Sequence, residues 1–246
     1  MILKESVASD MLSEFMQYLA ALDSSRAEQL PALVDLSEQL DISVASLREQ
    51  LEVARALGLV DVRPRTGIRR LPYSFRQTIK LSLAYALELG HEYFQQYSDL
   101  RSHIETIYWM QATQKLLPED LQSLFFLIER AESKLHGHPI QIPHVEHREL
   151  HLQIYKRLEN PFVTGMLEAY WEMYEAVGLN VYADYNYLER VWQYHREMVE
   201  AIYAKDFQKG HQLLVEHLNL LSQRPAAVAV MSPAGSTEGN KKSSLT

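Results

Sequence analysis

The chain has 246 residues, of which 47% are hydrophobic, so it is long enough for two domains of ordinary size with buried cores. Its net charge of −8 argues against a protein that binds nucleic acid over its whole surface, so a basic surface has to be local. It has no cysteine, no apolar run of membrane-spanning length and no signal peptide in its first residues, MILKESVASD, so we expect a cytoplasmic protein without disulfides, thiolate metal sites or a membrane partner.

The first predicted element is an amphipathic helix from Ser6 to Leu22. Its apolar residues recur at helical spacing: Val7, Met11, Phe15, Leu19 and Leu22. We expect this helix to pack beneath the next segment of the chain.

Residues 30–71 have the pattern of a winged helix-turn-helix. A short helix over residues 32–40 precedes a tight turn at Asp41-Ile42, and Ser43 can cap a second helix by accepting a free backbone N–H. This second helix ends at Gly58. Its predicted buried stripe is Leu47, Leu51 and Ala54, at i, i+4 and i+7.

Two short strands, Leu59–Arg63 and Ile68–Leu71, come after the second helix and are joined by a Pro-Arg-Thr-Gly turn. A unit of this kind places its second helix in the major groove of DNA, while the wing touches the backbone or the minor groove. The expected DNA contacts are Ser43, Val44, Ala45 and Arg48 on the helix, with Arg65, Thr66, Gly67 and Arg69 on the wing.

The end of this helix and the wing also carry a local positive charge. Between residues 55 and 70 there are five arginines (55, 63, 65, 69 and 70) against a single acid, Asp61. Such an excess is what a phosphate-binding surface needs. The alternative is a solvated run of charges, but the helix-turn-helix pattern beside it favours DNA binding.

The remainder of the chain predicts an all-helical second domain after a hinge at Pro72-Tyr73-Ser74. Helical patterns run from Phe75 to Arg224, with breaks at Gly90, Pro118, 136–144, Asn160-Pro161, 178–185 and Lys205-Asp206. The last stretch is small, polar and rich in Pro, Gly and Ser, which predicts a disordered tail. We therefore divide the chain into a winged head (1–71), a helical domain (72–224) and a tail (225–246).

Four histidines of the helical domain are spaced so that they can meet. His147 and His151, at i and i+4, share one helix face. His195 and His217 each lie 11 residues from Asp206, so in an antiparallel hairpin both sit roughly 16 Å from the turn. This arrangement favours a site for one divalent first-row ion, most readily Zn or Ni.

Chance is the alternative, because the chain has ten histidines and an i, i+4 pair among them is unremarkable. His144, three residues before His147, is the best reserve ligand. The remaining histidines are expected to be surface or core residues.

The head resembles the amino-terminal domain of the GntR family of bacterial transcription regulators. The matching positions, in order and spacing, are Leu30-Pro31, Ile42-Ser43, Leu47-Arg48-Glu49, Leu51, Gly58-Leu59-Val60 and Gly67. The chain departs from the family where Val34 and Val44 replace basic residues, which concerns the operator sequence and not the fold.

Residues 75–221 resemble the FCD ligand-binding domain of the FadR-like branch of that family. The similar segments are Asp99-Leu100-Arg101 with Ile104-Glu105, then HRELHLQIYKRLENPF, then HREMVEAIYAKDFQKGHQLLVEHL. The resemblance implies metal ligands at one Asp and three His, which fall on His151, His195 and His217. The position of the Asp holds His147 in this chain.

That replacement has a chemical consequence. Four neutral imidazoles would leave a divalent cation without a compensating negative charge, so we expect a small carboxylate effector. Arg101 matches a family position that faces the effector cavity, and arginine suits bidentate carboxylate capture. The alternative is that Arg101 pairs with Glu105 one helical turn on. His147 equally leaves open a weakened site or a changed metal.

The expected fold is mainly α, with an N-terminal winged helix-turn-helix and a C-terminal all-α, FCD-like bundle. The expected function is a transcription regulator, a repressor rather than an enzyme, that binds two-fold operator DNA as a homodimer and responds to the effector. The alternatives are a metal-dependent helical enzyme, or a sensor protein that has lost DNA binding, given Val34 and Val44.

Overall fold

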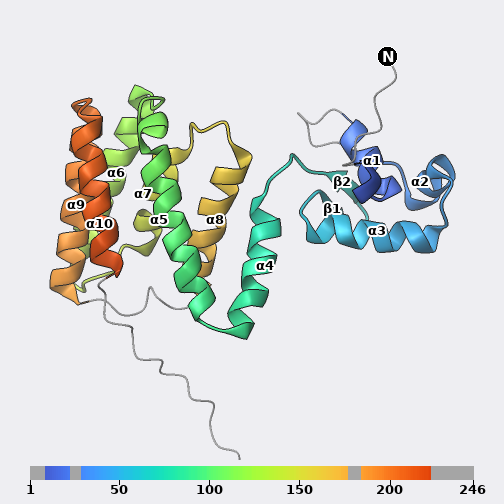
Figure 1. Ribbon diagram of the computed structural model, residues 1–246, viewed down its shortest axis with the longest axis horizontal. Helices are drawn as coiled ribbons and strands as arrows, with labels where there is room; N and C mark the ends of the chain where they lie inside the picture. The colour runs from blue at the N-terminus through green and yellow to red at the C-terminus, as the bar shows by residue number, and fades with distance from the viewer. Residues whose placement is uncertain (1–8, 23–28, 177–183, 223–246) are drawn as a thin grey trace, which may run out of the picture.

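The computed structural model describes residues 9–22, 29–176 and 184–222 of the chain. It places a small winged head at one end of the molecule and a helical bundle at the other (Figure 1). The helix α4 (Arg76–Leu89) comes after the head and leads into the bundle. The expected fold class, mainly α with a winged head and an all-α bundle, is confirmed.

The head is built from short elements. They are η1 (Ser9–Met11), α1 (Glu14–Ala21), α2 (Leu33–Leu40), α3 (Val44–Ala56), β1 (Val60–Arg63) and β2 (Gly67–Arg70). The first helix starts later than predicted, because the Ser13 hydroxyl accepts the backbone N–H of Met16 and begins α1 at Glu14. The part of the predicted helix before residue 9 lies outside the described residues.

The helix-turn-helix forms as its pattern predicts. Asp41 takes up the left-handed conformation that ends α2, with φ of 53°. The Ser43 hydroxyl then accepts the backbone N–H of Ser46 at 3.1 Å and begins α3. The predicted stripe of α3 is buried against α1, α2 and the wing, in a cluster formed by Phe15, Leu19, Leu30, Leu36, Leu47, Leu51, Ala54, Val60 and Ile68.

The wing is a two-stranded antiparallel hairpin in which Val60 lies opposite Arg70 and Arg63 opposite Gly67. The first strand starts one residue later than predicted, at Val60. The second strand starts and ends one residue earlier than predicted, at Gly67 and Arg70. The hydrogen bond from Leu71 N–H to Leu59 C=O, 2.9 Å long, continues the pairing beyond the strands.

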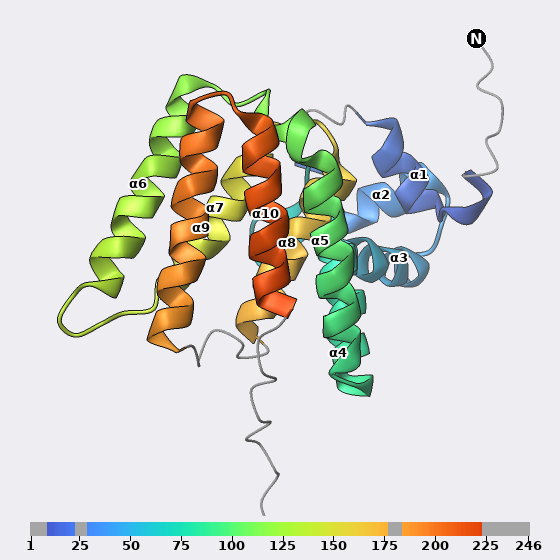
Figure 2. The same ribbon diagram turned by 60° about the vertical axis from the view of Figure 1, so that its left-hand side comes forward.

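Seven described helices come after the wing, and the bundle places α9 and α10 side by side with α5 and α6 next to them (Figure 2). After α4 these are α5 (Glu92–Thr113), α6 (Pro118–Leu135), α7 (His144–Tyr155), α8 (Pro161–Ala176), α9 (Tyr185–Tyr203) and α10 (Phe207–Ser222). Five of the six predicted breaks separate them, and most of the sixth, 178–185, lies outside the described residues. Asn160 caps α8 by accepting the N–H groups of Phe162 and Val163 at 3.1 and 3.3 Å.

The bundle has its own core, distinct from that of the head. Its large buried side chains include Trp109, Leu124, Ile128, Leu150 and Ile154. The helix α4 packs against α8. Gly165 on α8 has no side chain, so the backbone of residues 75 and 76 can approach that helix closely. Separate cores agree with a two-domain organisation. The exact domain boundaries, at residues 71 and 224, stay a prediction. The expected tail (225–246) lies outside the described residues.

None of the described helices is both long enough and apolar enough to cross a membrane.

Candidate functional site

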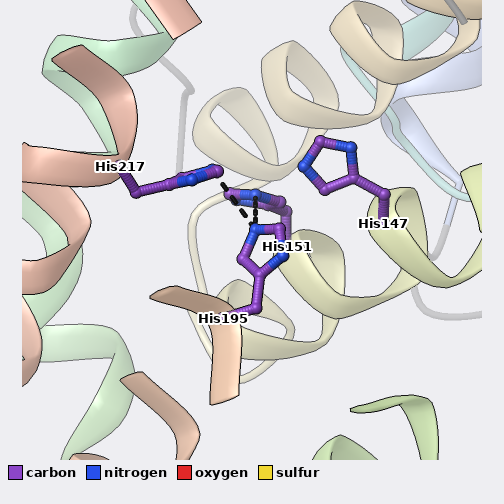
Figure 3. A group of neighbouring side chains, drawn as sticks. All are labelled: His147, His151, His195 and His217. Carbon is purple, nitrogen blue, oxygen red and sulfur yellow. Dashed lines mark hydrogen bonds between the residues drawn. The ribbon is translucent and has the colours of Figure 1, made fainter. Parts of the chain in front are cut away.

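Four imidazoles from three helices meet inside the bundle. His147 and His151 project from α7, His195 from α9 and His217 from α10 (Figure 3). The Nε2 atom of His195 lies 3.2 Å from Nε2 of His151 and 3.2 Å from Nε2 of His217. One nitrogen from each of the four rings falls within 4.8 Å of the others. His144, the reserve ligand, is not part of this group among the described residues.

Two of the nitrogen–nitrogen distances match those around a tetrahedral cation. With Zn–N bonds of 2.0–2.1 Å, two nitrogens of a tetrahedral site are about 3.3 Å apart, close to both His195 contacts. The Nε2 of His147 is buried and has no hydrogen-bond partner among the described residues. These four side chains could therefore hold a divalent ion, with His147 as the fourth ligand.

The surroundings keep the four rings neutral, which is the form that binds metals. Burial lowers the pKa of His147, His151, His195 and His217 well below the ordinary value of 6.5, and the positive charge of Arg101 lowers it further. His151, His195 and His217 are at most 1% exposed. Aromatic rings complete the enclosure, with the Trp171 ring centroid 4.7 Å from that of His147 and 5.0 Å from that of His151.

Arg101 lies directly beside this group. It is buried on α5, with Nη2 2.9 Å from Glu105 Oε2 and 3.0 Å from His151 Nδ1. Its guanidinium also stacks on Tyr170 and Trp171, 4.8 and 4.9 Å from the ring centroids. The pairing of Arg101 with Glu105, which the sequence left as an alternative, is therefore present, and contact of Arg101 with an effector stays a prediction.

Glu105 is the residue that sequence reasoning missed at this site. Its carboxylate is fully buried, and Oε1 lies 3.2 Å from Nδ1 of His151. Burial raises the pKa of Glu105, and the neighbouring Arg101 opposes that rise. The expectation of no negative charge near the imidazoles was therefore wrong in detail. Because Arg101 balances this carboxylate, however, a bound dication would still lack a net counter-charge.

The recognition helix α3 presents the predicted DNA-contacting residues at its first turns. Ala45 and Arg48 are exposed, Val44 is half-buried, and Ser43 is exposed while its hydroxyl caps the helix. Arg48 forms no ion pair with any described residue, so its guanidinium is available to a ligand. These residues share the end of α3 that a helix-turn-helix directs at base edges.

The wing presents the other predicted contacts. Arg65 and Gly67 both have positive φ, 69° and 78°, which makes the tight turn at the tip, and Arg65, Thr66, Gly67 and Arg69 are exposed. Gln29 donates from Nε2 to the backbone oxygen of Thr66 at 2.7 Å, which ties the tip to the body of the head. In the part of the chain that the structure describes, Arg65 and Arg69 make no ion pair.

Arg70 is a correction to the predicted basic surface. It is only 4% exposed, because β2 alternates and Arg70 shares the inner face with Ile68. Its Nη1 donates to the backbone oxygen of Leu19, 3.3 Å away. Arg70 therefore joins the wing to α1 and does not belong to the surface.

Two further arginines of the predicted basic run have acidic partners. Arg55 pairs with Glu52 at 2.6 Å, and Arg63 pairs with Asp61 at 2.7 Å. The local positive charge is thus smaller than the count of arginines suggested, and what remains of it lies on the wing, at Arg65 and Arg69.

Comparison with known proteins identifies the family of the helical domain. The FCD domain family matches residues 96–220, which contain all four histidines, Arg101 and Glu105. The chain is 22% identical over 221 residues to the uncharacterized HTH-type transcriptional regulator YcbG of Bacillus subtilis, covering 90% of this chain and 91% of that one. Its fold is similar to that of the Streptococcus agalactiae GntR structure, with a TM-score of 0.63 at 18% identity, covering 84% of this chain and 94% of that one. The chain therefore belongs to the FCD domain family and is a DNA-binding transcription regulator of the GntR type, not an enzyme.

Proposed function

We propose that this regulator is a repressor, and that it dissociates from operator DNA when a small carboxylate binds beside a metal ion in the FCD domain. The observation that carries the proposal is the group of four buried imidazole nitrogens within 4.8 Å of one another. A cluster of neutral, mutually facing nitrogen ligands in a buried core has little structural use, since apolar side chains would fill the same space at lower cost.

The metal ligands in this proposal are His147, His151, His195 and His217. A bound dication would supply a localised positive charge that attracts an anion into the core. Arg101 would orient the carboxylate of the effector, since its guanidinium is buried within 3.0 Å of His151. Zinc and nickel are the proposed ions, because imidazole suits both.

The proposed regulator acts in the cytoplasm as a homodimer with two winged heads (residues 1–71) carried by two helical domains (72–224). Two heads related by a two-fold axis would read a short pseudo-palindrome. The effector can release DNA only if it binds the DNA-incompetent arrangement more tightly, so effector and operator must weaken one another by the same factor.

DNA reading by α3 is tested with duplexes selected from a randomised library. We expect an enriched inverted repeat, and we expect Arg48→Ala to weaken binding to it about 5- to 150-fold, the value of one good base contact of about 1–3 kcal/mol. Binding is measured by fluorescence anisotropy at fixed salt.

Arg55→Ala is the matched control, because Arg55 lies on the same helix but at its far end, paired with Glu52. Equal effects of the two substitutions would contradict the proposed orientation of α3. A library that yields no enriched sequence would instead favour a sensor protein whose head has lost DNA binding.

The effector is sought by thermal shift with small carboxylates, each with and without zinc. A carboxylate at a hundredfold excess over its Kd should stabilise the protein by about 2.7 kcal/mol. We expect this stabilisation only when zinc is present, and we expect the same compound to release the selected duplex. A carboxylate that stabilises equally with a chelator present would show that the effector site does not depend on the metal.

A further inference from the structure

We propose that Glu105 is a positioning residue for His151: its carboxylate accepts the Nδ1–H of His151 and so leaves Nε2 of that ring free to bind the metal. This inference rests on the metal site proposed above. It adds a residue that is not a ligand, and it assigns a proton to a stated atom.

The two neighbours of His151 Nδ1 favour opposite protonation states of that nitrogen. Arg101 Nη2 lies 3.0 Å away and can only donate a hydrogen bond, whereas Glu105 Oε1 lies 3.2 Å away and, as a carboxylate, can only accept one. The nitrogen therefore has two possible states. Unprotonated Nδ1 satisfies Arg101, and protonated Nδ1 satisfies Glu105.

The other side of the ring decides between these states when a cation is present. Nε2 of His151 faces Nε2 of His195, which in turn faces Nε2 of His217, each at 3.2 Å. Without an ion, each of these contacts requires a proton on one of its two nitrogens. A cation bound by all three requires three unprotonated Nε2 atoms, so each neutral ring must then carry its proton on Nδ1.

Only one of the three Nδ1–H groups then has an acceptor. Nδ1 of His195 and Nδ1 of His217 are buried without a hydrogen-bond partner in the described part of the chain. His151 alone has a carboxylate within reach: Oε1 of Glu105 lies 3.2 Å from Nδ1 and is buried without a hydrogen-bond partner among the described residues, so it is open to accept that proton. Glu105 thus stabilises the metal-binding tautomer of His151.

The same proton has a second effect, on Arg101. Once Nδ1 of His151 carries hydrogen, it cannot accept from Arg101, so one N–H of Nη2 loses its acceptor. Arg101 keeps its contact with Glu105 Oε2 at 2.9 Å and gains a free donor in a buried position. Metal binding therefore prepares Arg101 for a carboxylate, which predicts that metal binds first and the effector second.

The test compares zinc affinity in Glu105→Gln and Glu146→Gln, measured by competition with a chromogenic chelator. Glu146 is the matched control because it is also a fully buried acid and lies on the ligand helix α7, but its partners are Arg130 at 2.7 Å and Lys134 at 2.8 Å. Loss of the carboxylate beside His151 should weaken zinc binding about 10- to 100-fold, and loss of the carboxylate at 146 should leave it unchanged.

A second readout needs only the wild-type chain, so it holds even if Glu105→Gln does not fold. Long-range ¹H–¹⁵N NMR of histidine-labelled, zinc-loaded protein reports which ring nitrogen carries the proton, with His151 assigned from the spectrum of His151→Gln. We expect the proton on Nδ1.

The outcomes separate the two proposals. If wild-type protein binds zinc but Glu105→Gln binds it equally tightly, the role of Glu105 is overturned and the metal site stands. If the proton of His151 sits on Nε2 in the zinc-loaded protein, His151 does not bind the ion through Nε2, and both the role of Glu105 and the proposed ligand set are overturned. If wild-type protein binds no zinc, both the metal site and the role of Glu105 are overturned.

Discussion

His195→Ala is expected to abolish high-affinity zinc binding, with a loss of more than 100-fold in affinity. The reason is geometric: Nε2 of His195 is the atom that contacts both His151 and His217, at 3.2 Å in each case. Loss of a partner that only orients a ligand costs about 10- to 100-fold, so loss of the central ligand should exceed that range. The measurement is zinc content after dialysis, together with chelator competition.

His103→Ala is the control for this substitution, because His103 lies on α5 with an exposed side chain. It should bind zinc as the wild type does. Since His195 is fully buried, the fold of the variant is checked by circular dichroism, and the melting temperature is compared with and without zinc. The site is supported if zinc raises the melting temperature of the wild-type protein but not that of folded His195→Ala. Equal zinc content in the two proteins would refute it.

The meeting of the histidines could be anticipated because it depends on quantities that sequence fixes well. The helical period places His147 and His151 on one face, and equal distances from a turn give equal heights in a hairpin. The turn itself is marked by Lys205, with φ of 59°, between α9 and α10. The rings accordingly lie together, and metal binding by them stays a prediction until zinc is measured.

Charged residues were harder to place, because a sequence gives their sign and not their direction. Arg70 was counted with the basic surface, although it lies two residues after Ile68 on a strand and so shares the buried face. The alternation of the strand was the available signal, and the count of arginines obscured it. Val60, buried opposite Arg70, shows the same inner face from the other strand.

Glu105 could be seen only as a helical neighbour of Arg101. Its contact with His151 joins α5 to α7, residues 46 positions apart in the chain, and depends on how the two helices cross. Spacing rules act within one helix, so they gave the ion pair as an alternative and could not give the second contact. Contacts of this kind set the proton positions, and they become visible only once helices are placed against one another.

Acid should strongly destabilise the metal-free protein between pH 7.5 and 5.5. The pKa of all four site histidines is lowered well below 6.5 in the folded chain, while in the unfolded chain these groups titrate near 6.5. The unfolded state therefore binds more protons as the pH falls through 6.5, and folding stability decreases. Each histidine costs about 1.4 kcal/mol between pH 7.5 and 5.5, so four cost about 5.5 kcal/mol, a large part of the stability of a domain.

Urea unfolding in a chelating buffer at pH 7.5, 6.5 and 5.5 measures this dependence. His103→Gln should reproduce the wild-type profile, since the side chain of His103 is exposed, and His217→Gln should reduce the decrease in stability by about a quarter. With zinc bound, the loss of folding stability should begin at a lower pH, because protons must first displace the ion from the rings. A stability that stays level from pH 7.5 to 5.5 in the chelating buffer would mean that the imidazoles titrate in the folded chain as they do in the unfolded one, so that burial does not keep them neutral.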